Sequence, residues 1–252
     1  KTESLNGIKI IMVKEGIFHF KTESYLADFR GKVTLPMIGN YLLHAASSHA
    51  AERGFGYSDM TERHTAWVLS RIAIELTDYP KMEEPITLYT WVGEVGRLFT
   101  ERCFELQDGD GKPFGFARSI WAAIDMETRR PTPLDVDGLG AYISDRSCPI
   151  EKPGKILPVE GEAEGTSFTV KYSDLDINGH LNSMKYMEHL LDLFDISMFE
   201  QKDIRRFEIS YLSEGRYGME LTLHSAETSP DQYAMAISHE GKAICRASVN
   251  WQ

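Results

Sequence analysis

Residues 98–125, LFTERCFELQDGDGKPFGFARSIWAAID, predict two antiparallel strands joined by a tight turn. The segment Asp108–Gly111 alternates Asp with Gly, and these residue types favour hairpin turns because they tolerate positive φ. The apolar and aromatic residues on either side are typical of strands over 98–107 and 113–125. A sheet that contains such a hairpin is antiparallel there, since a tight turn leaves no room for a crossover helix.

The same hairpin pattern returns near the end of the chain. Four residues recur at one constant offset, namely Gly111, Lys112, Ala117 and Trp121, which correspond to Gly241, Lys242, Ala247 and Trp251. A recurring pattern of this kind indicates an internal duplication.

The order of predicted elements supports that duplication, because each half holds a strand, a helix and then several strands. In the first half these are a strand at 18–29, a helix at 36–53, and strands at 65–78, 86–95, 98–107 and 113–125. In the second half they are a strand at 166–172, a helix at 183–198, and strands at 204–213, 217–227, 231–239 and 242–251. One long helix can cover the apolar face of one antiparallel sheet, so the fold class is α+β.

A segment rich in proline and glycine separates the two halves. Its prolines are Pro131, Pro133, Pro149, Pro153 and Pro158. Such a segment predicts a connector with little regular structure. We therefore expect an N-terminal unit at 12–128, a connector at 129–165 and a C-terminal unit at 166–252.

Composition excludes several classes of function. The 252 residues carry 27 Lys and Arg against 38 Asp and Glu, a net charge of −11, which argues against nucleic-acid binding. No run approaches the roughly 18 apolar residues of a membrane span. Cys103, Cys148 and Cys245 are too few and too far apart for a disulfide framework or a zinc site, and they are typical of small buried residues. The familiar nucleotide and metal motifs are also missing from the sequence, so we expect no cofactor and no metal.

The densest polar segment is Ser173–Ser183, SDLDINGHLNS, just before the second predicted helix. A plain interpretation is a loop in which Asp174 or Asp176 stabilises a turn and Asn182 or Ser183 caps the helix. His180 favours chemistry instead, because an imidazole transfers protons near neutral pH. It would also lie beside the free N–H groups of a helix N-terminus, which can hold a developing oxyanion.

The pattern Asp176-x-Asn178-x-His180-x-Asn182, followed by Lys185-Tyr186, resembles the active-site segment of acyl-acyl carrier protein (acyl-ACP) thioesterases of the plant plastid and bacterial type. The first half resembles the same family, in the same order, at Trp67–Ile72, Tyr79-Pro80, Thr90-Trp91, Gly96-Arg97 and Asp125–Arg130. The resemblance covers roughly residues 16–252. It implies a double hotdog, in which two units of sheet wrapped on a long helix follow each other in one chain.

The resemblance implies catalytic roles for Asp176, Asn178 and His180, and for Glu214, which lies at the family's downstream acidic position. Plant members usually carry Cys after that Glu, whereas this chain has Gly215, so a cysteine nucleophile is not expected. Water would attack the thioester carbonyl, with Glu214 as general base or water positioner. His180 would orient the thioester or share the proton, and Asp176 would orient a neighbour. Backbone N–H groups near the second helix, with Asn178, would hold the oxyanion.

The first half lacks a second copy of this motif. Aligning Asp28 with Asp174 places Arg30, Lys32 and Thr34 where Asp176, Asn178 and His180 lie. We therefore expect one active site per chain, with Glu94 as a structural relic of Glu214. The helix at 36–53 and the strand at 65–76 are expected to form the acyl pocket.

Hydrolysis of acyl-ACP to a free fatty acid is thus the expected function, in the bacterial cytoplasm, with acyl carrier protein as partner and no nucleic acid or membrane. An acyl-CoA thioesterase, a non-catalytic acyl-binding module and a hotdog dehydratase stay open as alternatives. An acidic carrier protein would need a local basic patch, and the candidates are Arg129-Arg130, Arg205-Arg206, Lys152 and Lys155. Two fused units are compatible with a monomer or a homodimer.

Overall fold

The computed structural model describes residues 4–5, 8–9, 13–159 and 166–252. The expected unit boundaries at residues 12 and 165 lie outside these ranges. The first half contains β1 (Ser4–Leu5), β2 (Ile8–Lys9), β3 (Glu15–Lys21), a 3-10 turn (Ser24–Leu26), α1 (Leu35–Ala51), α2 (Tyr57–Glu62), β4 (Thr65–Leu76), β5 (Pro85–Val95), β6 (Phe99–Gln107) and β7 (Pro113–Asp125). After α3 (Val136–Gly140) come β8 (Thr166–Thr169), a 3-10 turn (Tyr172–Asp174), α4 (Ser183–Leu191), α5 (Ile196–Gln201), β9 (Ile204–Tyr211), β10 (Glu220–Ser229), β11 (Gln232–His239) and β12 (Lys242–Trp251).

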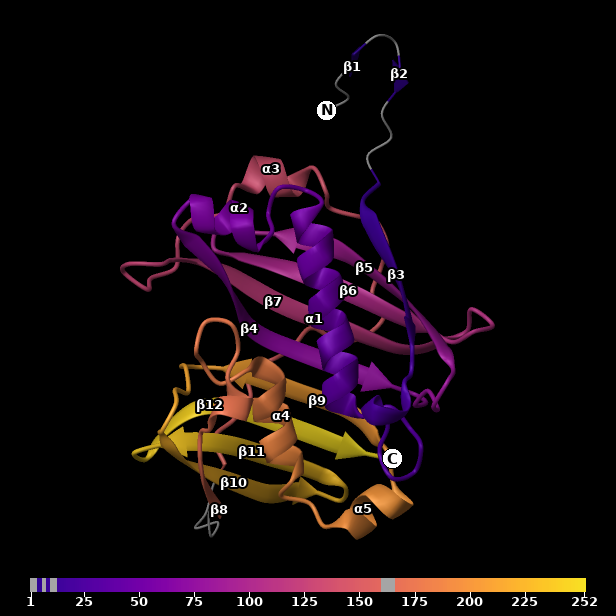
Figure 1. Cartoon of the computed structure of the whole chain (residues 1–252), viewed down its shortest axis with the longest axis vertical. Coiled ribbons are helices and arrows are strands. Elements are labelled where there is room, and N and C mark those ends of the chain that lie inside the picture. The colour runs from indigo at the N-terminus through magenta and orange to yellow at the C-terminus, as the bar shows by residue number, and fades with distance from the viewer. Residues whose placement is uncertain (1–3, 6–7, 10–12, 160–165) are drawn as a thin grey trace.

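Ten strands of the described chain form one antiparallel sheet (Figure 1), in the order β3-β5-β6-β7-β4-β9-β12-β11-β10-β8. The order is symmetric about the β4–β9 pair. Counted outward from it, β4-β7-β6-β5-β3 matches β9-β12-β11-β10-β8. This symmetry confirms the inferred duplication and the α+β class, and it joins the two halves edge to edge.

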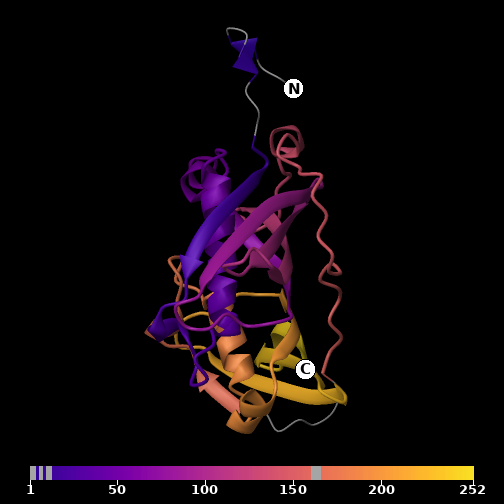
Figure 2. The same cartoon turned by 90° about the vertical axis from the view of Figure 1, so that its right-hand side faces the viewer.

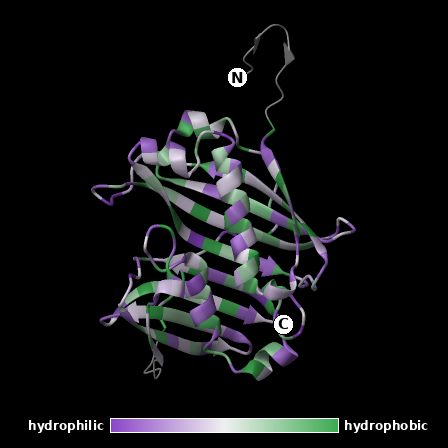
Figure 3. Ribbon diagram, viewed as in Figure 1, coloured by the Kyte–Doolittle hydropathy of each residue, from purple (hydrophilic) through white to green (hydrophobic). Residues whose placement is uncertain are grey.

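The long helices α1 and α4 lie on the same face of the sheet (Figures 1 and 2). Helix α1 begins where the Thr34 side chain accepts a hydrogen bond from the Met37 N–H, 3.3 Å away. It buries Ile38, Leu42 and Ala45 against the strands. Figure 3 shows the hydrophobic residues of the strands behind both helices. Each half is therefore a helix wrapped by its own part of the sheet.

The two helices also touch each other, and a glycine allows this contact. A Cβ on Gly39 of α1 would lie 2.1 Å from the Met184 sulfur of α4. A larger residue at position 39 would therefore displace the Met184 side chain from this contact.

The predicted second helix at 183–198 is wrong in its length. Helix α4 ends at Leu191, and a new helix, α5, begins at Ile196. The Asp195 carboxylate accepts a hydrogen bond from the Ser197 N–H at 2.9 Å and so caps α5. The predicted strand at 18–29 is likewise too long, since β3 ends at Lys21, and α2 was not predicted at all.

The part of the connector around residues 148–150 packs on the face of the sheet opposite α1 and α4 (Figure 2). Its Cys148 and Ile150 are buried against Trp91 and Cys103 of the sheet. The prediction of three buried, free cysteines is confirmed. Both faces of the first half's sheet are thus covered. In the described ranges, no helix combines the length and apolarity needed to cross a membrane.

Candidate active site

The loop before α4 is built around the Asp176 carboxylate. One of its oxygens accepts hydrogen bonds from the backbone N–H groups of Asn178, at 2.8 Å, and His180, at 3.1 Å. The Asp176 N–H in turn donates to the His180 carbonyl at 2.8 Å. Gly179 has φ +75°, which favours glycine at this turn. The side chain of Asp176 therefore fixes the loop that presents His180.

The first half has the same loop around Asp28. That carboxylate accepts from the N–H groups of Arg30, at 2.8 Å, and Lys32, at 3.1 Å. The counterpart of Asp28 is therefore Asp176, and the predicted alignment with Asp174 is wrong by two residues. In the corrected alignment Lys32 corresponds to His180. This loop still holds neither His nor Asn.

Arg30 and Lys32 bind Asp203 instead, at 2.8 and 2.7 Å. Their side chains therefore tie the first half to the second rather than forming a second copy of the site.

Glu214 lies beside His180. The His180 Nε2 and a Glu214 carboxylate oxygen are 3.2 Å apart. Arg129 forms an ion pair with the same carboxylate, and Arg216 approaches it at 3.4 Å. The Leu181 N–H donates to the Gly215 carbonyl at 2.9 Å and so joins the two loops. The structure thus brings together two of the four predicted site residues directly.

Tyr186 of α4 holds the Glu214 loop in place. The Gly215 N–H donates to its hydroxyl at 2.7 Å, and the hydroxyl donates to the Ser213 carbonyl at 3.3 Å. A Cβ on Gly215 would lie 3.0 Å from the Cβ of Leu181 and 3.2 Å from the Tyr186 oxygen. This tight packing gives a physical reason for glycine at the position where the plant members carry cysteine.

The predicted relic of Glu214 is in the wrong place. The Val33 N–H donates to the Pro80 carbonyl just as Leu181 does to Gly215, so the counterpart of Glu214 is Tyr79. Tyr79 is buried, and its hydroxyl donates to the Ile204 carbonyl at 2.9 Å. Glu94 lies on β5 and pairs with Lys152. The duplicated position therefore has a structural role in the first half.

Burial lowers the pKa of His180 below its ordinary value. Asp176 acts against this shift, whereas the cations Arg129 and Arg216 add to it. An imidazole with a lowered pKa is neutral at pH 7. Its ring can then donate one hydrogen bond and accept another.

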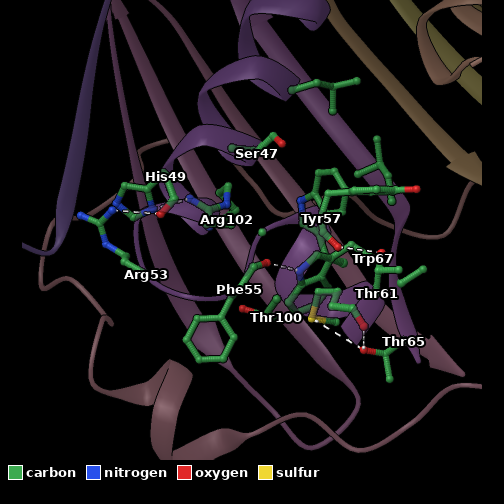
Figure 4. A pocket seen from close by; sticks show the side chains of 18 of the residues that line it. Ser47, His49, Arg53, Phe55, Tyr57, Thr61, Thr65, Trp67, Thr100 and Arg102 are labelled. Carbon is green, nitrogen blue, oxygen red and sulfur yellow. Dashed lines mark hydrogen bonds between the residues drawn. The ribbon is translucent and has the colours of Figure 1, made fainter. Parts of the chain in front are cut away.

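A cavity of about 330 Å³ opens next to these loops, between α1 and the first half's sheet (Figure 4). Asp176, Asn178 and Asn182 line it on the side of the second half. Asn182 also caps α4, as predicted, by accepting from the Met184 N–H at 2.8 Å. Most of the remaining wall is apolar, including Leu43, Phe55, Trp67, Leu69 and Leu139. The other two predicted site residues therefore face an apolar pocket.

Sequence reasoning missed the two arginines that hold Glu214. Arg129 was noted as part of a family-like segment and as a basic pair, but its contact with Glu214 crosses between the halves. Only the fold brings these positions together. Arg216, two residues after Glu214, was noted only because Gly215-Arg216 repeats Gly96-Arg97, and no role was predicted for it.

Residues 17–142 match the family of the acyl-ACP thioesterase N-terminal domain, and residues 159–252 match that of its C-terminal domain. These two ranges cover most of the chain. The chain belongs to the acyl-ACP thioesterase family. The first range contains the pocket helix α1, and the second contains the Asp176 loop and Glu214.

Solved structures of the family show the same double hotdog. An acyl-ACP thioesterase from Bacteroides thetaiotaomicron is 43% identical, with a TM-score of 0.91 over 95% of this chain and 98% of that one. The 12:0-ACP thioesterase from Umbellularia californica is 21% identical, with a TM-score of 0.86 over 96% of this chain and 98% of that one. The predicted fold is confirmed.

Longer relatives come from plant plastids. The dodecanoyl-ACP hydrolase of Cinnamomum camphora is 26% identical over 92% of this chain and 66% of its own length. Oleoyl-ACP thioesterase 2 of Arabidopsis thaliana is 26% identical over 77% of this chain and 58% of its own length. This member of the acyl-ACP thioesterase family thus spans about two thirds or less of these relatives.

Proposed function

We propose that this chain hydrolyses the thioester of acyl-ACP and releases a free fatty acid. The observation that carries the proposal is the 3.2 Å contact of His180 with Glu214, next to a pocket lined by Asp176 and Asn178. A carboxylate and a neutral imidazole together can activate water. The apolar pocket offers a place for the acyl chain.

In the proposed reaction a water molecule between Glu214 and the thioester carbonyl attacks the carbonyl carbon. Glu214 takes the proton of that water, while neutral His180 donates a hydrogen bond from Nε2 to the carboxylate and orients it. Arg129 and Arg216 hold the same carboxylate from the other side. The proton then passes to the leaving thiolate, which departs as the free thiol of the carrier.

The negative charge on the carbonyl oxygen needs donors in the transition state. The Asn178 side-chain amide and the first turn of α4 are proposed to supply them, since both lie at the pocket wall. Asp176 acts as a positioning residue, because its carboxylate is already bound to two N–H groups of the loop.

The proposed partner is an acidic carrier protein, whose arm would deliver the thioester to this pocket in the bacterial cytoplasm. Arg205 and Arg206 lie at the junction of the halves, where both approach Glu75. Lys152 is paired with Glu94 and Glu101. Arg130 and Arg216 are exposed next to the site, so they are the proposed docking cations. Acyl-CoA is the alternative substrate, because its phosphates would meet the same cations.

The test is thiol release from dodecanoyl-ACP and dodecanoyl-CoA by the wild type, His180→Ala and Glu214→Gln. Each substitution is expected to lower kcat by about 100-fold or more. Glu227→Gln, at an exposed position, and His239→Ala, at a half-buried one, are matched controls on the second half's sheet. Near-wild-type turnover by Glu214→Gln would overturn its role as the base. Release from CoA alone would favour the acyl-CoA class, and acyl binding without any release would leave a binding module.

A further inference from the structure

One wall of the pocket carries a cation without a counter-ion. Arg102 of β6 lines the pocket, and its Nη1 lies 2.9 Å from the His49 Nδ1 and 3.3 Å from the Thr90 hydroxyl (Figure 4). Across the described part of the chain, no carboxylate lies within 4.0 Å of its guanidinium. Neither polar contact of Arg102 is with a carboxylate: one is with the Thr90 hydroxyl and the other with the His49 imidazole.

The strand geometry explains why no acid reaches Arg102. Its sequence neighbour Glu101 points to the opposite face of the sheet, where it pairs with Arg118 and Lys152, both at 2.8 Å. On the adjacent strands Arg102 is paired with Val92 and Ser119, neither of which is charged. The face that meets the pocket thus lacks a compensating side chain.

The histidine beside Arg102 does not compensate the charge. His49 is fully buried, and burial together with the nearby cations Arg102 and Arg53 lowers its pKa to about 3, so it is neutral. Burial also lowers the pKa of Arg102, to about 10, and Arg53 adds to that shift. Arg102 therefore remains a cation at pH 7, in an apolar pocket where an unpaired charge is costly.

A second arginine in the same pocket serves as a comparison. Arg53 pairs with Glu52 at 3.0 Å and donates to the carbonyl oxygens of His49, at 2.9 Å, and Val13, at 2.8 Å. Its hydrogen bonds join the end of α1 to Val13, which precedes β3. Arg102 alone of this pair presents a cation that a ligand could neutralise.

Arg102 lies far from the proposed reacting centre. Arg102 of β6 is paired with Ser119 of β7. Asp125 lies six residues further along β7, which corresponds to about 20 Å, and its carbonyl accepts from the N–H of Arg129, the residue that contacts Glu214. An acyl chain whose thioester lies beside His180 would therefore bring its far end toward Arg102.

We propose that Arg102 makes this pocket selective for acyl chains with a hydrogen-bond-accepting oxygen near their far end, a hydroxyl or a carboxylate, over chains that end in a methyl group. A methyl group against the guanidinium would keep the cation away from water and give it no partner. An oxygen acceptor would form a charge-assisted hydrogen bond, and a carboxylate would also balance the charge. This inference rests on the proposed function, because it names the substrate class of the same site.

The first experiment compares kcat/KM for dodecanoyl-ACP, ω-hydroxydodecanoyl-ACP and the ACP monothioester of dodecanedioic acid, with the decanoyl and octanoyl series beside them. The wild type is expected to favour at least one oxygenated chain by roughly tenfold or more at the best length, the worth of one charge-assisted hydrogen bond. Arg102→Met should lose that preference. Arg53→Met should keep it, because Arg53 is paired already.

A binding measurement decides the inference independently of turnover. Calorimetric titration with dodecanoic, ω-hydroxydodecanoic and dodecanedioic acids uses the wild type, Arg102→Met and, should the Met variant not fold, Arg102→Gln. Tighter binding of an oxygenated acid by the wild type, lost in the variant, supports the inference whether or not any substrate is hydrolysed. If no substrate is hydrolysed, the proposed function fails and the inference about binding stands. Equal or weaker binding and turnover of both oxygenated chains at every length would overturn the inference and leave hydrolysis of plain chains standing.

Discussion

At the scale of single residues, the charge of His180 sets the expected pH dependence. The proposed reaction needs neutral His180, so the rate is lost as pH falls through its pKa. Burial lowers that pKa, so the acid limb of kcat/KM should lie below about pH 6.5, the ordinary value for histidine.

Two variants should shift this acid limb in opposite directions. Arg216 is one of the cations that lower the pKa of His180, so Arg216→Gln should move the limb to higher pH. Asp176→Asn removes an opposing charge and should move it to lower pH. Steady-state profiles with dodecanoyl-ACP measure both shifts, and movement of the two variants in the same direction would contradict this assignment.

The sequence could predict candidate residues of the site but not all their neighbours. Asp176, Asn178, His180 and Glu214 were predicted from a local pattern and a resemblance. Arg102 was not found, because in a strand a charged residue ordinarily marks the solvent face. Here the connector covers one face of the sheet and α1 the other, so alternation carries no such information.

At the scale of elements, the two helix caps separate stability from catalysis. Thr34 caps α1 and Asn182 caps α4, each by accepting a backbone hydrogen bond in the first turn. Thr34→Ala and Asn182→Ala should each lower the free energy of unfolding by about 1 kcal/mol. Only Asn182→Ala should also lower kcat, because the start of α4 is proposed to hold the oxyanion. Urea unfolding and thiol release measure the two effects, and an equal loss of activity in Thr34→Ala would show that both losses come from stability.

Element boundaries were harder to predict than element types. The helix at 183–198 was predicted as continuous because Phe194 and Met198 extend the apolar spacing of α4. Asp195 ends that continuity by capping a new helix. A capping side chain within an apolar pattern competes with helix propagation, and spacing alone does not show which prevails.

At the scale of the whole molecule, the duplicated order of elements was predictable but the joining of the halves was not. Nothing in the alternation of β4 or β9 says that each pairs with the other. The junction is revealed by partners far apart in sequence, such as Arg206 with Glu75 and Tyr79 with Ile204. The same junction brings Arg129 to Glu214, so the site itself depends on how the halves meet.

Because β4 and β9 share one continuous ladder, the two halves should unfold together. Ile209 of β9 is fully buried and paired with Ile72 of β4, so Ile209→Ala should lower the free energy of unfolding by about 2–5 kcal/mol.

Tryptophan fluorescence can follow each half separately. Trp251 reports on the second half, and Trp67, Trp91 and Trp121 report on the first. In urea titrations of Trp251→Phe, the remaining fluorescence should therefore follow the same transition as far-UV circular dichroism, with Ile209→Ala moving both midpoints equally. Ile17→Ala, at an exposed position of β3, is the control that should move neither. Joint unfolding is expected because separated halves would each expose an apolar edge strand. Two separate transitions would instead mean that the pairing of β4 with β9 contributes little to stability.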